Sequence, residues 1–330
     1  MQKVTERFKI GLKQEEIDFV DVNLESDALL FLNPTLFREL VDTDFSKKVS
    51  HNVYSFFETV LNLYSTNRKN QAIKLFNQSG ETNSVHLGYS KTNKGKGTSE
   101  KALTKLFDTV LSSKVLENKV LSNPISLVLF VEDFAEDRMS DLIISILKKE
   151  LIEYTLEQAI LYHIAIEIDE INYGQYWDAS SRSWKILKNR YIKDQKGNPI
   201  ILVPKQIISK KYGFSANTYL SNVILKWRQA KHSAELSNLC EIKRDKNGNI
   251  IKVKPPSQKI LRKIEIDEVY RVKRGKTKKY IMNKTFENPG LLDQFFEQHT
   301  NEAVKRNGNI LSDQEITKII EESESDNNTK

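Results

Sequence analysis

The sequence predicts an α/β protein of the mixed α+β class, with a central sheet flanked by helices and a basic, β-hairpin-rich C-terminal region. Three observations predict this class. Apolar and polar residues alternate over 19–31, apolar residues recur at helical spacing over 51–65 and 142–152, and glycine-containing turns separate β-prone runs after residue 182. A chain of 330 residues is also long enough to form two domains.

We expect the chain to divide into three parts. An α/β core domain over residues 1–240 precedes a basic C-terminal region over residues 241–320. The last ten residues, 321–330, read EESESDNNTK and carry too few apolar side chains to pack, which predicts a disordered tail.

In the first part, the alternating segment 19–31 predicts a half-buried strand that ends at Asn33-Pro34. A short helix is expected after Pro34, because proline is well suited to the first turn of a helix. Residues 51–65 carry aromatic and aliphatic side chains at three- and four-residue spacing, which predicts a core helix.

The middle of the chain begins with the run ISLVLFV over residues 125–131. This uninterrupted β-prone run predicts a strand covered on both faces. A long amphipathic helix should follow it. Its buried stripe is expected to consist of Leu142, Ile143, Ile146, Leu147, Leu151 and Ile152.

After residue 182 the turns dominate the pattern. A hairpin is predicted from strands at 184–187 and 200–203 with a turn at 196–199, and a helix over 213–231 follows. The dipeptide Asn247-Gly248, set between short β-prone segments, predicts a second hairpin.

Charge is distributed unevenly along the chain. Residues 182–284 contain 27 Lys/Arg and 7 Asp/Glu, a net charge of +20, whereas residues 1–181 carry −7 and residues 285–330 carry −6. Such a density of positive charge opposes compaction unless a polyanion or the acidic parts of the chain neutralise it. Nucleic acid is the commonest such polyanion, and DNA is favoured over RNA here. The alternative is a solvated basic face or a docking surface for an acidic protein.

Other classes are excluded by composition. A single cysteine, Cys240, excludes an internal disulfide and a cysteine-based zinc site. The charged N-terminal sequence MQKVTERFKIGLKQEE lacks the apolar stretch of a signal peptide, and the apolar run at 125–131 is too short to span a bilayer. We therefore expect a cytoplasmic protein without membrane contact.

Five carboxylates fall within ten residues between the predicted buried strand and the following helix. Strand ends of this kind often carry active sites in α/β folds, and closely spaced carboxylates suit Mg²⁺. A metal-dependent nuclease would use them to hold the ion at a phosphodiester. The metal ligands would be Asp137 and Asp141, with Glu132 or Asp133. The alternative is structural: Asp137 caps the helix and Arg138 pairs with Asp141.

Lys205 is the candidate partner of these carboxylates. It follows the β-prone run IILV and Pro204, so it could approach a phosphate or polarise an attacking water. Nucleases of the PD-(D/E)xK type place an acid and a lysine on such a hairpin. This sequence departs from that pattern because Val203 occupies the position two before Lys205. A solvated lysine is the alternative.

The basic segments predict the nucleic-acid contacts. Lysine and arginine alternate there with aromatic residues, which suits phosphate contacts combined with base stacking. A glycine- and lysine-rich loop around Lys96 could also approach phosphate, although it lacks the spacing of a Walker A motif. The candidate contact residues are Lys96, Arg228, Lys231, Lys243, Arg244, Arg271, Lys273, Arg274 and Lys276.

Four strings occur in an order that resembles a largely uncharacterised family of bacterial proteins encoded near restriction and phage-defence genes. They are FVDVNLESDALLFLNPTLF, HLGYSKTNKGKG, EDRMSDLIISILKKELIEYT and GNPIILVPK, and the resemblance extends over roughly residues 17–230. The resemblance implies an antiviral-defence protein that acts on nucleic acid, with a restriction-endonuclease-like activity. The matching positions include Asp21, His86, Asp137, Asp141 and Lys205.

Two functional hypotheses follow. In the first, the protein is a Mg²⁺-dependent nuclease, with Asp137, Asp141 and Lys205 converging on one cleft. In the second, it is a non-catalytic nucleic-acid-binding or regulatory subunit of a defence complex, and the acidic cluster only caps a helix.

Overall fold

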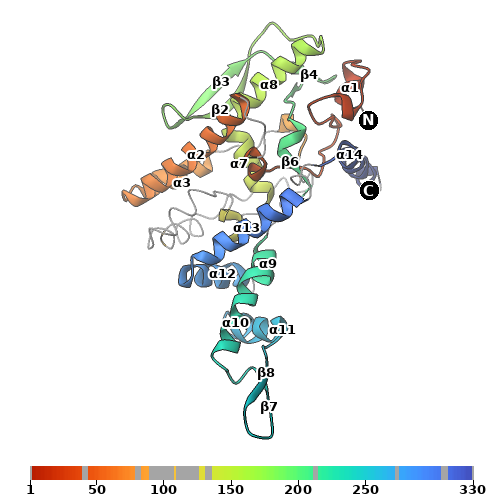
Figure 1. Ribbon diagram of the computed structural model, residues 1–330. Helices are drawn as coiled ribbons and strands as arrows, with labels where there is room; N and C mark the ends of the chain where they lie inside the picture. The colour runs from red at the N-terminus through yellow and green to blue at the C-terminus, as the bar shows by residue number, and fades with distance from the viewer. Residues whose placement is uncertain are drawn as a thin grey trace.

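The fold combines many helices with short strands. A computed structural model describes residues 2–38, 44–78, 83–88, 108, 126–130, 136–210, 215–271, 275–305 and 311–328. The mixed class is confirmed, but the central sheet is not found in these residues. Their strands form four two-stranded antiparallel sheets, which pair β1 with β6, β2 with β3, β4 with β5 and β7 with β8 (Figure 1).

The predicted strand over 19–31 is shorter than expected. Only β1 (Phe31–Leu32) is a strand, paired with β6 (Ile208–Ser209). Asp21 and Asn23 are buried like their apolar neighbours, so the alternation does not separate a core face from a solvent face. The backbone of this segment bonds to several different partners instead of one neighbouring strand: the N–H of Val20 donates to the carbonyl of Val203 at 3.0 Å, and that of Asp21 donates to the side chain of Gln14.

Short helical turns surround this segment. They are α1 (Val4–Arg7), η1 (Gln14–Glu16), η2 (Pro34–Arg38), η3 (Asn83–Val85) and η4 (Lys205–Ile207). The helical turn expected after Pro34 is confirmed as η2, a 3-10 helix.

The core helix predicted at 51–65 is confirmed as part of α2 (Asp44–Ser65), which is followed by α3 (Lys69–Asn77). Phe56 of α2 is at the centre of an aromatic cluster, where its ring makes edge contacts with those of Phe57, Phe76, Trp177 and Trp184. The two tryptophans belong to the paired strands β2 (Ile171–Asp178) and β3 (Ser183–Asn189). This hairpin is thereby fixed to the helices by its aromatic residues.

The run at 125–131 is helical where the structure describes it, so the predicted strand is wrong. Residues Ser126–Phe130 form α6, and Leu127, Val128 and Leu129 are buried. A short run that is apolar on all sides satisfies a buried helix as well as a buried strand, and periodicity does not separate the two. The amphipathic stretch after it forms α7 (Glu136–Ile146) and α8 (Lys148–Leu161), with all six residues of the predicted stripe buried.

The predicted hairpin over 184–203 has a different partner. Trp184–Leu187 lies in β3 and pairs with β2, whereas the turn at 196–199 joins β4 (Ile192–Lys193) to β5 (Pro199–Ile200). The next predicted helix is confirmed as α9 (Ala216–Tyr219), the π-helical turn η5 (Leu220–Ile224) and α10 (Leu225–Ala234).

Helices dominate the C-terminal part, contrary to the hairpin-rich expectation. The described residues after 240 contain one hairpin, β7 (Glu241–Arg244) with β8 (Ile250–Lys254). The remaining elements are α11 (Gln258–Leu261), η6 (Arg262–Asp267), α12 (Lys276–Glu287), α13 (Gly290–Lys305) and α14 (Asp313–Asn328).

The disordered tail is also contradicted, because residues 321–328 lie within α14. Ile316, Ile319, Ile320 and Ser323 are buried at three- and four-residue spacing, so this helix packs one face against the N-terminal part of the chain (Figure 1). None of the described helices is both long enough and apolar enough to cross a bilayer.

Candidate nucleic-acid interface

The hairpin β7–β8 is a two-stranded ribbon that extends from the far end of the molecule, opposite the β2–β3 hairpin (Figure 1). Its turn is built by Asp245, whose carboxylate Oδ1 accepts the backbone N–H groups of Asn247 and Asn249, each at 2.8 Å. Hydrogen bonds from Asn249, then from Asn247, lower the pKa of Asp245. Gly248 lies in the left-handed region at φ 85°, which explains the need for glycine in this turn.

The register of the ribbon places two lysines side by side. Lys243 of β7 is directly opposite Lys252 of β8, so both side chains stand on the same face. On that face Lys254 forms an ion pair with Glu241 at 3.0 Å. The pair Ile242–Val253 lies on the other face, half-buried. The lysine face of the ribbon therefore presents to solvent two like charges, Lys243 and Lys252, that form no ion pair with any residue the structure describes.

Apolar side chains lie near the turn end of the ribbon. Ile250 and Ile251 are 41% and 60% exposed, and Arg244 donates from Nη1 to the carbonyl of Gly248 at 2.9 Å. The base of the ribbon is attached to α10, where Gln229 Nε2 donates to the carbonyl of Pro256 at 2.8 Å. The exposed surface thus combines cations with apolar groups on a ribbon whose base is hydrogen-bonded to α10.

Arg228 has a structural position. Its Nε and Nη2 atoms donate to the carboxylate of Glu265 at 2.9 to 3.1 Å, and its side chain is only 14% exposed. Tyr280 and His232 also bond to Glu265. Burial alone would raise the pKa of Glu265, but the hydrogen bonds from Arg228, Tyr280 and His232 lower it to about 2. Because its guanidinium is bound in this cluster, Arg228 is a poor choice for a phosphate contact.

The other predicted contact residues have mixed positions. Lys231 on α10 is exposed, 3.9 Å from Glu235, and its ammonium lies 5.7 Å from the ring centroid of Trp227. Arg271 is exposed, and Lys276 is ion-paired with Asp267. Lys96, Lys273 and Arg274 lie outside the described residues.

The predicted catalytic carboxylates lie in α7. Asp137 is in its first turn and Asp141 one turn later, and both are half-buried. The position of Asp137 in the first turn agrees with the alternative that it only stabilises the helix, since a negative charge there interacts favourably with the helix dipole. Glu132 and Asp133 lie outside the described residues, and within those residues no group of three or more His, Cys, Asp or Glu side chains could hold a metal ion. The magnesium site stays a prediction.

Lys205 contacts elements other than α7. Its ammonium forms an ion pair with Asp313 of α14 at 2.8 Å and donates to the carbonyl of Gln14 at 3.2 Å. Lys205 therefore links the C-terminal helix to the N-terminal segment. Its role beside Asp137 and Asp141 is a prediction that these contacts do not support.

Sequence reasoning missed two features of the site. The face-to-face placement of Lys243 and Lys252 follows from the register of a hairpin with a turn at Asn247-Gly248, so the sequence contained that signal. The ion pair between Arg228 and Glu265 depends on packing between α10 and η6, and no local sequence pattern predicts that packing.

Comparisons with known proteins give one family. No curated protein and no solved structure matches the chain. A family model described as a domain of unknown function (DUF8370) matches residues 9–215. The match ends at Ser215, the N-cap residue of α9, so the ribbon and the C-terminal helices lie after it. Because the match covers more than half of the sequence, the chain belongs to the DUF8370 family.

Proposed function

We propose that the protein binds nucleic acid through the β7–β8 ribbon and the adjoining exposed face of α10. The observation that carries this proposal is the pair Lys243 and Lys252, directly opposite one another on an exposed ribbon. Like charges placed directly across a strand pair destabilise the pair. A polyanion would turn that cost into a favourable contact, because phosphate binding by lysine releases condensed counterions.

The shape of the ribbon favours duplex DNA. A two-stranded antiparallel ribbon fits the major groove, where side chains reach base edges. In this arrangement Lys243 and Lys252 would contact the phosphates that border the groove. Ile250 and Ile251, exposed near the turn, would supply apolar contacts such as those made with thymine methyl groups.

Lys231 and Trp227 extend the proposed surface onto α10. The cation–π contact between them orients the lysine, whose ion pair with Glu235 is long, at 3.9 Å, and exposed to solvent. The exposed Lys226 lies on the same helix. The proposed contact surface thus joins a ribbon and a helix that are fixed to each other through Gln229 and Pro256.

The nuclease and defence hypotheses stay predictions beside this proposal. Cleavage of plasmid DNA with Mg²⁺, lost in Asp137→Ala/Asp141→Ala and blocked by EDTA, would establish the nuclease. Binding without cleavage would leave the protein a binding or regulatory subunit, and another subunit would then have to supply any chemistry.

Fluorescence anisotropy with a labelled 20-base-pair DNA duplex tests the binding proposal. The variant Lys243→Gln/Lys252→Gln should weaken binding about tenfold or more, because two phosphate contacts are lost. The matched control is Lys188→Gln/Arg190→Gln, which removes the same charge from exposed residues on and next to β3, at the other end of the molecule (Figure 1).

Equal weakening in both double variants would mean that only net charge matters, and the ribbon would lose its assigned role. No binding by the wild-type protein would overturn the proposal. A labelled single-stranded RNA in the same titration separates a duplex ligand from a single-stranded one.

A further inference from the structure

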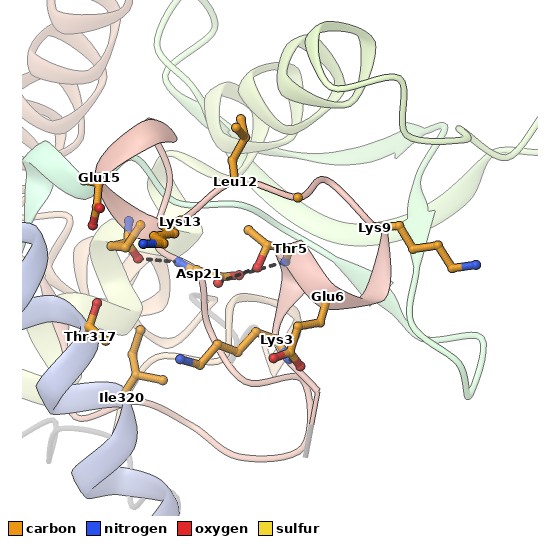
Figure 2. A pocket seen from close by; sticks show the side chains of 12 residues that line it. Lys3, Thr5, Glu6, Lys9, Leu12, Lys13, Glu15, Asp21, Thr317 and Ile320 are labelled. Carbon is orange, nitrogen blue, oxygen red and sulfur yellow. Dashed lines mark hydrogen bonds between the residues drawn. The ribbon is translucent and has the colours of Figure 1, made fainter.

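A pocket of about 590 Å³ lies between the N-terminal segment and α14 (Figure 2). None of its lining residues belongs to the ribbon. This volume is in the range of sites that hold small organic molecules. Its walls come from residues 3–21 and from two residues of α14. The lining includes Lys3, Thr5, Lys13, Asp21, Thr317 and Ile320.

The floor of the pocket is a fixed polar group. Asp21 is only 7% exposed, and its two carboxylate oxygens accept from the backbone N–H of Thr5 at 2.8 Å and from the hydroxyl of Thr5 at 2.7 Å. Gln14 holds the same segment by bonding to Asp21 and Phe19. Burial raises the pKa of Asp21 in spite of these bonds. Since a carboxylate oxygen has two lone pairs, each can still accept a hydrogen bond from a ligand hydroxyl.

Two lysines flank this floor. Figure 2 shows Lys3 and Lys13 on either side of Asp21, with Lys13 exposed at the rim of the pocket, whereas Lys9 extends away from Asp21. Within the part of the chain that the structure describes, the ammonium groups of Lys3 and Lys13 form no ion pair. Glu6, which lies nearby, is engaged by the backbone N–H of Lys3 at 3.2 Å. The ammonium of Lys3 also attracts the Asp21 carboxylate and partly offsets the rise in its pKa that burial causes, and both ammonium groups can contact an anion in the pocket.

The C-terminal helix completes the pocket. Thr317 and Ile320 form its far wall, and α14 is held there by the ion pair between Lys205 and Asp313. Lys205 also bonds to the carbonyl of Gln14, the residue that positions Asp21. The pocket is therefore assembled by two segments from opposite ends of the chain, which Lys205 links, and is not a groove in one loop.

We infer that this pocket binds a small phosphate monoester that carries hydroxyl groups, the chemistry shared by nucleotides and sugar phosphates. Lys3 and Lys13 contact the phosphate, since lysine ammonium groups are common phosphate binders. Asp21 and Thr5 accept hydroxyl groups of the ligand at the floor. This site is separate from the ribbon, and the inference does not depend on nucleic-acid binding.

Isothermal titration calorimetry with the full-length protein tests the inference. The probes are AMP, ribose 5-phosphate, adenosine and inorganic phosphate. AMP or ribose 5-phosphate should bind, and adenosine should not. Lys3→Gln and Lys13→Gln should each weaken binding about tenfold, the effect of losing one charged hydrogen bond. Lys9→Gln makes the same charge change on a side chain that points away, so it should bind like wild type.

The outcomes separate the alternatives. Binding of both AMP and ribose 5-phosphate identifies the sugar phosphate as the recognised part, and binding of AMP alone identifies a nucleotide. Inorganic phosphate bound as tightly as AMP would overturn the role of Asp21 and Thr5. No binding of either ester at millimolar concentration, or equal loss in Lys9→Gln, would overturn the site.

Discussion

Glu150, on α8, carries a buried carboxyl group, and burial disfavours its ionised form. Its side chain is 7% exposed, Oε1 accepts from Asn52 Nδ2 at 2.8 Å, and Oε2 is buried with no hydrogen-bond partner. Burial raises the pKa of this carboxyl. The folded state therefore holds a proton that the unfolded state releases, and the free energy of unfolding falls as the pH rises from the unfolded pKa through the folded one.

We predict that Glu150→Gln stabilises the protein at pH 8 by about 1 kcal/mol, because the amide keeps the bond to Asn52 without a buried charge. Below pH 4 both side chains are neutral and the gain should disappear. Urea denaturation at pH 8 and pH 4 measures both values. Glu157→Gln, exposed on the same helix, is the control and should have no effect. A destabilised Glu150→Gln at pH 8 would contradict the assignment.

The pKa of Glu265 is shifted in the opposite direction to that of Glu150. Its pKa of about 2 lies below the ordinary value of 4.5, so its contribution is present above the unfolded pKa and is lost as the pH falls through 2. Removing its charge leaves Arg228 half-buried without its partner. Glu265→Gln should therefore lower the free energy of unfolding by about 3 kcal/mol at pH 7, and by much less near pH 2.

The measurement is again urea denaturation, here at pH 7 and pH 2.5. Glu268→Gln removes an exposed charge just after η6 and should leave stability unchanged. If the loss in Glu265→Gln were the same at both pH values, the carboxylate would not be the ionised partner of Arg228.

At the scale of elements, α14 shows how a polar sequence can still be ordered. Its buried residues include Ile316 and Ile319, and the side chains of Asp313 and Glu322 pair with Lys205 and Lys210. We predict slow amide exchange over 313–323 in the wild-type protein. Ile316→Ala removes a fully buried side chain and should expose α14 to exchange while α2 keeps its protection.

Hydrogen exchange followed by mass spectrometry reads both helices in one experiment. Thr317→Ala, a neighbouring half-buried position, is the control and should keep α14 protected. Rapid exchange of residues 313–323 in the wild-type protein would mean that the C-terminal helix is not docked.

Elements differed in how well the sequence predicted them. The turn at Asn247-Gly248 and the buried stripe of α7 and α8 depend on local patterns, and both were predicted correctly. The run at 125–131 was wrong because burial on all sides removes the periodicity that separates helix from strand. The tail was wrong because three isoleucines just before it anchor a helix that continues through the polar residues.

In the candidate sites, too, features set by local sequence were predictable, and features set by packing between distant segments were not. Lys243 of the ribbon was predicted as a contact residue, but its cross-strand partner Lys252 was not, although a hairpin register is set locally. Arg228 was assigned to the surface although it is bound to Glu265. The pocket at Asp21 was not predicted, since its walls come from opposite ends of the chain. Only packing between distant segments brings them together.

At the scale of the whole molecule, charge and shape act together. The +20 charge of residues 182–284 is partly neutralised by acids from other parts of the chain, for instance where Lys205 forms an ion pair with Asp313. Lys243 and Lys252 of the ribbon form no such pair within the described residues, and the ribbon extends away from the acidic N-terminal part (Figure 1). Nucleic acid could thus reach the ribbon without contacting the acidic surface.

The salt dependence of duplex binding tests this account most directly. Binding constants measured by anisotropy between 50 and 300 mM KCl should fall linearly on a double logarithmic plot. In Lys243→Gln/Lys252→Gln the slope should be shallower by about 2, one for each lost phosphate contact, while Lys188→Gln/Arg190→Gln keeps the wild-type slope. An unchanged slope in the ribbon variant, or wild-type binding that does not respond to salt, would contradict the assignment of the ribbon as the nucleic-acid interface.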